Sequence, residues 1–260
     1  MKTLLITGGS SGIGLATVEL FAAKGWQVFE LSRSGLSHDS VIHISCDVTN
    51  EQSVQAAVEE VMRHTDYLDV VISNAGFGIS GPIEFTAVAE AQKQFDVNFF
   101  GAMRLVKTVL PIMRQQRYGR IIFTSSVAAD LSIPYQSFYS ASKASLNAMA
   151  LALANEVRQF GIRVSVLMPG DVATGFTDAR EKSMNGSEVY AGMHSAVAAM
   201  EKDERGGMTP THMARDLYHI ATCYSPKPIY IGGAVYKIFC LLNCLLPKRM
   251  VNWIVGRLYC

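Results

Sequence analysis

Short apolar runs and glycine-rich turns alternate regularly along this chain. Apolar positions spaced three and four residues apart predict helices between these runs. Strands that are apolar at nearly every position are typical of a parallel sheet covered by helices on both faces. We therefore expect an α/β fold, with one domain built on a doubly wound parallel sheet of about seven strands. The expected strands are residues 3–7, 27–31, 41–45, 68–73, 120–125, 162–168 and 227–231, and the expected helices are 15–25, 50–64, 90–116, 139–161 and one beginning at Thr209-Pro210.

The last third of the chain departs from this alternation. Residues 171–208 are polar, punctuated by glycine and only partly helical, so we expect a movable lid within a catalytic domain of residues 1–232. Methionines at 184, 193, 200 and 208 would give the lid an adaptable apolar lining. Residues 233–260 are apolar with scattered Lys and Arg, and predict two short helices meeting at Pro247. This tail packs on the substrate mouth or a partner subunit, which we favour, or it inserts shallowly at a membrane surface.

Composition narrows the class of protein. A length of 260 residues suits one large domain, and 49% hydrophobic residues leave room for a covered sheet and an apolar site. A net charge of +1 gives no indication of a nucleic-acid partner. Five cysteines (46, 223, 240, 244 and 260) form neither a disulfide framework nor a metal set, so we expect reduced thiols, no metal and a cytoplasmic location. Met1 leads directly into a strand, and no apolar run reaches 18 residues, so neither a signal peptide nor a membrane span is expected.

A glycine-rich turn lies between the first strand and the first helix. Glycines permit a tight turn and a close approach of backbone to phosphate, while a helix N-terminus offers unpaired N–H groups. A flexible loop is the alternative, but the strand and helix on either side favour binding of a dinucleotide. The candidate residues of this turn are Gly8, Ser10, Ser11, Gly12, Ile13 and Gly14.

The end of the second strand bears on the choice of cofactor. A carboxylate at this place would accept hydrogen bonds from the ribose hydroxyls of NAD, whereas an arginine accommodates the 2′-phosphate of NADP. Here the strand ends in Ser32 and Arg33, with no Asp or Glu among residues 32–34. NADP(H) is therefore expected, with NAD(H) as the alternative if Arg33 is only a surface side chain.

Tyr139 and Lys143 stand four residues apart, with Ser126 thirteen residues before the tyrosine. On a helix this spacing places the phenol and the ammonium on one face. The ammonium would favour tyrosinate and move the phenol pKa from about 10 towards neutrality, making Tyr139 a general acid/base for an alcohol oxygen. Ser126 could supply a second hydrogen bond to that oxygen. Taken alone, the spacing also fits an amphipathic helix that carries Tyr and Lys by chance, and the rest of the pattern favours chemistry.

The motifs together resemble the short-chain dehydrogenase/reductase family, in the form whose chains have about this length, over roughly residues 3–231. The resemblance implies a Rossmann fold with strand order 3-2-1-4-5-6-7 and NAD(P)-dependent interconversion of an alcohol and a carbonyl group. It also implies a homodimer or homotetramer. The motifs that carry it, in chain order, are residues 7–14, Asp47, residues 74–76, Asn98, Ser126, Tyr139 with Lys143, and Pro169-Gly170.

The same resemblance implies roles for single residues. Tyr139 would transfer the proton, Lys143 would lower its pKa and bind the nicotinamide ribose, and Ser126 rather than Ser125 would orient the substrate oxygen. Asn98 would hold a water molecule that links Lys143 to solvent. The residues expected to contact the cofactor elsewhere are Asp47 and Val48 at the adenine, Asn74, Ala75 and Gly76 along the cofactor, and Pro169, Gly170, Val172 and Thr174 towards the carboxamide.

The sequences around Ser126 and Tyr139 and the apolar tail are similar to those of hydroxysteroid and retinol dehydrogenases. This similarity implies a lipophilic substrate. We expect an NADP(H)-preferring carbonyl reductase or alcohol dehydrogenase, cytoplasmic and with weak peripheral membrane contact through residues 233–260. Two alternatives remain: a regulatory protein that binds NADP(H) without catalysis, and a membrane-surface scaffold built on the tail. NADPH consumption with a panel of ketones discriminates among them.

Overall fold

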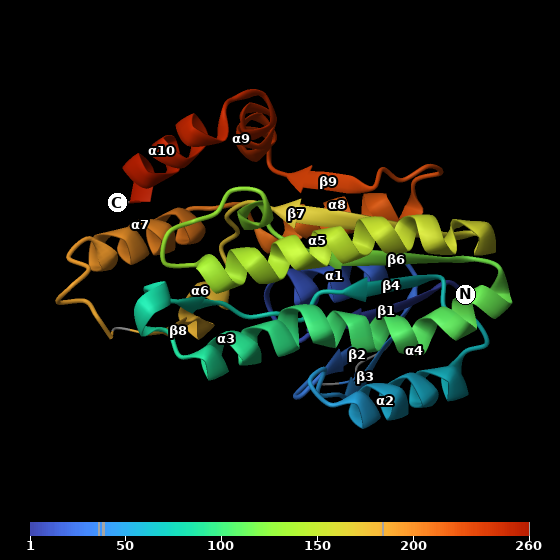
Figure 1. The fold of residues 1–260 in the computed structure, drawn as a ribbon. Helices are drawn as coiled ribbons and strands as arrows, with labels where there is room; N and C mark the ends of the chain where they lie inside the picture. The colour runs from blue at the N-terminus through green and yellow to red at the C-terminus, as the bar shows by residue number, and fades with distance from the viewer. Residues whose placement is uncertain (36, 38–39, 184, 260) are drawn as a thin grey trace.

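The computed structural model describes residues 1–35, 37, 40–183 and 185–259. Seven parallel strands form the central sheet in the order β3-β2-β1-β4-β6-β7-β9 (Figure 1). Numbered within this sheet alone, the order is 3-2-1-4-5-6-7, so the predicted doubly wound topology is confirmed. The strands are β1 (Thr3–Thr7), β2 (Gln27–Ser32), β3 (Val41–Ser45), β4 (Val70–Ser73), β6 (Gly119–Thr124), β7 (Ile162–Pro169) and β9 (Ile229–Gly232).

Helices cover both faces of the sheet, because successive side chains of each strand point to opposite faces. Leu4 of β1 is buried in a core with α1 (Gly12–Ala23) and α8 (Pro210–Thr222). Leu5, the next residue, belongs to a second core on the other face. That face is covered by α2 (Glu51–His64), α4 (Gly101–Gln116) and α5 (Ser137–Val157). Strands buried on both faces explain the continuous apolar runs of the sequence.

The ends of α1 and α2 lie within three residues of the predicted bounds 15–25 and 50–64, and two other predicted helices differ more. The single helix expected over residues 90–116 is α3 (Val88–Phe95), a π-helical turn (Asp96–Phe100) and then α4. The helix expected to reach Gly161 ends at Val157 and continues as a 3-10 turn (Arg158–Phe160). Gly161 then turns the chain with φ of +75°, which glycine adopts without strain.

The segment expected as a lid contains α6 (Phe176–Ala179), β8 (Glu181–Lys182) and α7 (Met193–Arg205). Strand β8 pairs with β5 (Ile79–Ser80), a small sheet that the sequence did not predict. Met193 and Met200 are buried in a cluster with Ile133, Tyr135, Tyr190 and Tyr259. Met208 packs against the core of α1 and α8 instead, and Met184 lies outside the described residues. Thr209 is the residue before α8 and its side chain makes no capping hydrogen bond, while Pro210 stands at the first position of the helix.

The tail forms the two predicted helices, α9 (Ala234–Leu245) and α10 (Lys248–Tyr259), which meet at Pro247. Figure 1 shows α10 beside α7 at the end of the sheet. Half of the exposed large apolar side chains of the described residues belong to these two helices: Val235, Ile238, Phe239, Leu241, Leu242, Leu245, Met250, Trp253, Ile254 and Leu258.

The structure also bears on the cysteines, on groups of metal ligands and on membrane-spanning helices. Cys46, Cys223, Cys240 and Cys244 are free thiols, and Cys260 lies outside the described residues. Over the described ranges, no group of three potential metal ligands occurs. Within the same part of the chain, no helix has both the length and the apolar character needed to cross a membrane.

Candidate functional site

One cavity of about 770 Å³ lies at the carboxyl ends of the strands. This is the edge where ligands bind in open parallel sheets. Of the predicted site residues, only Gly14 and Asn98 are not in its lining. The predicted residues that line it are Gly8, Ser10, Ser11, Gly12, Ile13, Ser32, Arg33, Asp47, Val48, Asn74, Ala75, Gly76, Ser126, Tyr139, Lys143, Pro169, Gly170, Val172 and Thr174.

The glycine turn has the shape that a phosphate group needs. Gly8 and Gly12 adopt φ of +67° and +54°, which few other residues adopt without strain. A Cβ on Gly14 would lie 2.0 Å from the carbonyl oxygen of Gly8, so this glycine packs the helix against the turn. No side chain caps the first turn of α1 and no acidic residue stands in it, so its N–H groups and positive dipole face the cavity. These residues fit the phosphates of a dinucleotide.

Arg33 follows directly after β2 and is exposed at the rim of the cavity. It makes no ion pair with any described residue. The hydroxyl of Ser32 donates to Glu30 (3.1 Å) and to the carbonyl of Ser34 (2.8 Å). Hydrogen bonds from Thr49 hold the pKa of Asp47 below its usual value, and the charge of Arg33 acts in the same direction. Arg33 therefore places a positive charge in the lining of the cavity, without an ion pair among the described residues.

Sequence reasoning missed Glu30, a carboxylate buried inside β2 at 3% exposure. Its Oε1 accepts from the backbone N–H of Gly9 at 2.9 Å, and its Oε2 lies 2.6 Å from Nδ1 of His43. Ser32 also donates to Oε2, so both carboxylate oxygens of Glu30 have polar partners within the protein. Glu30 thus supports the turn and is not free to bind a ribose. An acidic residue within the apolar run QVFELS was the available signal.

Tyr139 and Lys143 lie one turn apart on α5, as predicted, with the lysine Nζ 5.9 Å from the tyrosine ring centroid. Nζ donates to the carbonyl of Thr124 at 2.9 Å, at the end of β6. Ser126 lies just beyond β6 and its hydrogen bond acts on the phenol of Tyr139. The hydroxyl of Ser125 is directed elsewhere, towards the carbonyl of Lys143 (3.3 Å). The structure therefore brings Ser126, and not Ser125, to the tyrosine.

The pKa of Tyr139 differs from the expectation that Lys143 would lower it. Burial raises the pKa of Tyr139 to about 12, although the hydrogen bond from Ser126 partly opposes this. Burial also lowers the pKa of Lys143 to about 8, because an ammonium is as poorly solvated there as a phenolate. For both groups desolvation is the largest cause of the pKa shift. The spacing in the sequence could not reveal this, since burial depends on how distant segments pack around the two side chains.

Asn98 is buried at 1% exposure in the π-helical turn before α4. Its amide bonds to both backbone groups of Phe77 and donates to Ser142, each at 3.0 Å. A Cβ on Gly76 would lie 3.1 Å from Oδ1 of Asn98 and 3.4 Å from Nζ of Lys143. Asn98 therefore ties the loop after β4 to Ser142 of α5, the residue before Lys143, and π-helical turns are frequent at functional sites.

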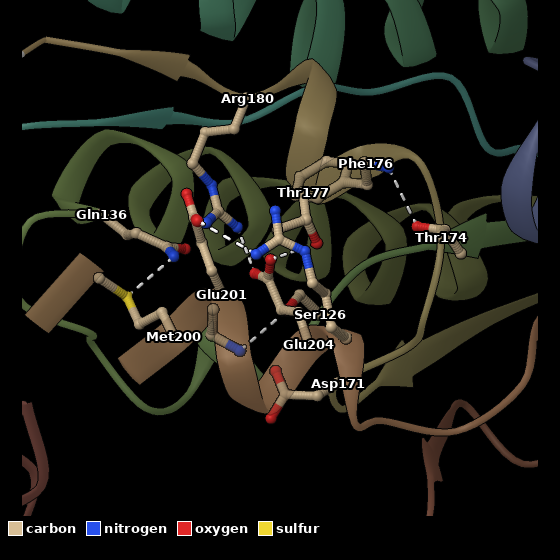
Figure 2. A network of polar contacts seen from close by, with 12 residues as sticks. Ser126, Gln136, Asp171, Thr174, Phe176, Thr177, Arg180, Met200, Glu201 and Glu204 are labelled. Atoms are coloured by element: carbon tan, nitrogen blue, oxygen red, sulfur yellow. Dashed lines mark hydrogen bonds and ion pairs between the residues drawn. The ribbon is translucent and has the colours of Figure 1, made fainter. Parts of the chain in front are cut away.

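The lid closes the other side of the cavity and supplies residues that sequence reasoning did not single out. The Phe176 ring lies 5.6 Å from that of Tyr139. Figure 2 shows Arg180 directed at Glu204 of α7, with which it forms a buried ion pair. Thr177 donates to the same carboxylate at 2.7 Å, and Gln136 donates to the sulfur of Met200 at 3.0 Å. The apolar part of this wall is formed by Ala128, Ile133, Phe176, Ala179 and Met200.

The tail also reaches the site. Tyr236 of α9 donates to Oδ2 of Asp171 at 2.5 Å, and Tyr259 of α10 lines the cavity. A Cβ on Gly170 would lie 2.1 Å from the Tyr236 ring, so only glycine there allows this contact. Part of the tail thus packs on the mouth of the cavity, as we favoured, while its outer face remains exposed.

Comparisons with known proteins agree with this geometry. The family model described as short chain dehydrogenase matches residues 2–185. A 3-ketodihydrosphingosine reductase of Bacteroides thetaiotaomicron is 37% identical over 99% of this chain and 98% of its own length. The dehydrogenase/reductase SDR family member 7B of Danio rerio is 30% identical over 98% of this chain and 85% of its own length. The crystal structure of a short-chain dehydrogenase from Streptomyces avermitilis matches with a TM-score of 0.86 and 28% identity, over 98% of this chain and 97% of that one.

Proposed function

This chain belongs to the short-chain dehydrogenase/reductase family, and on that premise we propose that it is an NADP(H)-preferring reductase of a long-chain lipophilic ketone. Members of the family act on CH–OH groups, and this chain is an oxidoreductase that interconverts an alcohol and a ketone. The observation that carries the proposal is a single cavity that joins a glycine turn, the exposed Arg33 and the Ser126–Tyr139–Lys143 group to an apolar wall.

The reaction follows from where these side chains lie. A bound nicotinamide cofactor supplies or accepts the hydride at the carbonyl carbon. Tyr139 donates its phenolic proton to the carbonyl oxygen during reduction and takes it back during oxidation. Ser126 holds that oxygen beside the phenol. Lys143 would bind a ribose hydroxyl of the cofactor, and its ammonium would favour the phenolate form of Tyr139. Asn98 holds the loop after β4 through Phe77 and bonds to Ser142 of α5, the residue before Lys143.

The cofactor would be held by the residues that line the other half of the cavity. The N-terminus of α1 and the turn at Gly8 and Gly12 would bind the pyrophosphate. Asp47 and Val48 would contact the adenine and residues 74–76 the middle of the cofactor. The carboxamide end would be contacted by Pro169, Gly170, Val172 and Thr174. Arg33, exposed and without an ion pair in the described part of the chain, would bind the 2′-phosphate of NADP(H).

The cofactor preference is tested by kcat/KM with NADPH and with NADH. A charge-assisted contact of about 1.5–3 kcal/mol corresponds to about one to two decades in favour of NADPH. The double variant Ser32→Asp with Arg33→Ala should reverse the order, since it removes the attraction and adds repulsion against the phosphate. If the wild type uses NADH as well as NADPH, Arg33 is only a surface residue and this part of the proposal is wrong.

The proposed substrate is a lipid-like ketone. Ala128, Ile133, Phe176 and Met200 give the lid side of the cavity an apolar surface. A relative that is 37% identical along nearly the whole chain carries the name 3-ketodihydrosphingosine reductase. Both observations support a long hydrocarbon chain beside the reacting carbonyl. Turnover with ketones of increasing chain length tests this, and a preference for short, water-soluble ketones contradicts it.

We also propose that the outer face of the tail lies on an anionic membrane surface, from which a lipid substrate would enter. Residues 233–260 contain Lys237, Lys248, Arg249 and Arg257 but no acidic residue. Ile238, Trp253 and Leu258 are exposed at 58%, 62% and 62%. Basic and apolar side chains on one short helical segment are typical of interfacial binding.

Flotation with anionic and neutral vesicles measures this contact. We expect flotation with anionic vesicles only, and its loss in Trp253→Ser with Leu258→Ser, which leaves the inward-facing Tyr236 and Tyr259 in place. Equal flotation of the wild type and of the double variant with anionic vesicles would contradict the proposal. A cytoplasmic location, expected from the cysteines, and a homodimer or homotetramer, expected from the resemblance, remain part of the proposal. Analytical sedimentation of the purified protein measures its oligomeric state.

The alternative function is an NADP(H)-binding regulator without catalysis. The cavity contains Ser126, Tyr139 and Lys143 together, which favours the enzyme. A protein that binds NADPH tightly yet oxidises none of it with any ketone of the panel would support the regulator instead. A membrane-surface scaffold would show vesicle binding without NADPH oxidation.

A further inference from the structure

The loop that follows β7 runs from the sheet to the glycine turn. At its start the N–H of Gly170 donates to the carbonyl of Gly232, at the end of β9, at 3.3 Å. At its end a Cβ on Gly12 would lie 3.3 Å from Cβ of Thr174. Asp171, between these two points, lines the cavity. The position of this loop therefore depends on the contacts that hold its middle.

The middle of the loop has a backbone support and a side-chain support. The carbonyl of Asp171 accepts from the N–H of Met208, and the N–H of Ala173 donates to the carbonyl of Met208, each at 2.9 Å. From α9, the Tyr236 hydroxyl donates to Oδ2 of Asp171 at 2.5 Å. Within the described ranges, this is the one hydrogen bond of the Asp171 carboxylate, and Figure 2 shows that carboxylate apart from the dashed network between α6 and α7. The side-chain support of the loop therefore comes from the tail.

The Tyr236 ring packs on the same loop. A Cβ on Gly170 would lie 2.1 Å from this ring, and a Cβ on Gly233 would lie 2.9 Å from it. Gly233 precedes α9 with φ of +91°, which glycine adopts without strain. The ring and the hydroxyl of Tyr236 thus act on two neighbouring residues of the loop, and a change that removes only the hydroxyl separates the two contacts.

The helix that carries Tyr236 is itself anchored beside the site. Tyr236, Cys240 and Asn243 are spaced four and three residues apart, which places them on one face of α9. Cys240 is buried in the core on the α5 face of the sheet. Asn243 donates to the carbonyl of Asp130 at 3.1 Å, in the segment that follows β6. Because this face of α9 is fixed, the Tyr236 hydroxyl has a defined position from which to hold the loop.

Building on the proposed function, we propose that Tyr236 is a positioning residue: through Asp171 it fixes the loop of residues 169–174, where the carboxamide end of the cofactor would bind. Tyr236 does not itself line the cavity, so it acts on a ligand there through the loop. A loop that is already fixed loses less conformational freedom when a ligand binds, and this raises affinity. The hydrogen bond therefore favours binding of the nicotinamide half of the cofactor and leaves the adenosine half unaffected.

Calorimetric titration of the full chain with two ligands tests this role. One ligand is NADPH, and the other is 2′-phospho-ADP-ribose, the same molecule without its nicotinamide. Tyr236→Phe removes the hydroxyl and keeps the ring on Gly170. We expect it to bind NADPH about tenfold more weakly, the lower end of what a hydrogen bond to a charged group contributes. The fragment without nicotinamide should bind within about twofold of the wild type.

The matched control is Tyr190→Phe. Tyr190 also donates to a carboxylate, that of Glu84 at 2.9 Å, but it does not line the cavity or contact the loop after β7. This variant should bind both ligands as the wild type does. Loss of NADPH affinity as large as in Tyr236→Phe would overturn the inference, since any bond between a tyrosine and a carboxylate would then have the same effect.

A double-mutant cycle tests whether Tyr236 acts through Asp171. Asp171→Ala removes the acceptor, so it should weaken NADPH binding by itself. In that background Tyr236→Phe should change NADPH affinity by less than about twofold, because the bond is already absent. If the two losses multiply instead, Tyr236 does not act through Asp171 and the inference is wrong.

The two ligands also separate this inference from the proposed function. If Tyr236→Phe binds NADPH as the wild type does, or loses affinity equally for NADPH and for the fragment, the positioning role is wrong while the reductase stands. If the wild type binds NADH and not NADPH, NADH and ADP-ribose take the place of the two ligands, with the same expected results. If the wild type binds neither NADPH nor NADH, the proposed function fails and this inference fails with it.

Discussion

Removal of Glu204 should destabilise the protein through Arg180. The Arg180 side chain is 1% exposed and its Nη2 is bound to Glu204. Its Nε and Nη1 have no hydrogen-bond partner among the residues that the structure describes. Breaking a buried ion pair at one end typically costs about 3–5 kcal/mol, since it leaves an uncompensated charge. Because the Glu204 side chain keeps 14% exposure, we expect the lower end of this range for Glu204→Leu. About 3 kcal/mol corresponds to a fall of about 6 °C in Tm for a chain of this size.

Thermal unfolding followed by circular dichroism measures this effect, with the double variant Arg180→Met and Glu204→Leu as control. The double variant replaces both charges by apolar groups, so it should lie within about 2 °C of the wild type. KM for the ketone should rise in Glu204→Leu, because the pair joins α6 to α7 beside the cavity. If Glu204→Leu changes Tm by less than about 1 °C, the pair does not hold the lid and the reasoning is refuted.

Two further predictions concern the cofactor turn and the buried lysine. Gly14→Ala should weaken NADPH binding more than about tenfold, because its Cβ would lie 2.0 Å from the carbonyl oxygen of Gly8. Gly192→Ala is the control and should bind NADPH normally, because its Cβ would have no atom within 4 Å. Fluorescence titration with NADPH compares the two variants. Burial lowers the pKa of Lys143 to about 8, below its unfolded value, so the unfolded chain binds more protons above pH 8. Wild type should therefore gain stability relative to Lys143→Met as pH rises from about 8 to 10, and a constant difference in urea unfolding would contradict this.

The topology was predictable because the local signals agreed with the fold. β1 and β3 have the predicted bounds, since turn-forming or polar residues flank both apolar runs. Val54 and Val61 of α2 are buried as their spacing indicates. The cavity-lining residues follow the strand ends, and parallel strands bring those ends to one edge.

The features that sequence reasoning missed depend on contacts between distant segments. Tyr236 reaches Asp171 across 65 positions, which no local pattern signals. The raised pKa of Tyr139 depends on its burial in the folded chain, where the ring of Phe176 lies 5.6 Å away. The π-helical turn carries Asn98, whose amide bonds to Phe77 and Ser142 in distant segments. Glu30 reads as a solvent-facing strand residue until its bonds to Gly9 and His43 are known. The residues of the candidate site are therefore those whose environment is set by contacts with distant segments and not by local sequence preference.

The turnover of Tyr139→Phe, measured together with its affinity for NADPH, tests the central claim most directly. The substitution removes only the hydroxyl that is beside Ser126, and leaves the ring against Phe176. Turnover of a long-chain ketone should fall about 10²–10⁴-fold, the usual contribution of a general acid/base, with NADPH affinity within about threefold of wild type. A variant that keeps more than about a tenth of wild-type turnover would contradict the assignment of Tyr139 as the proton donor.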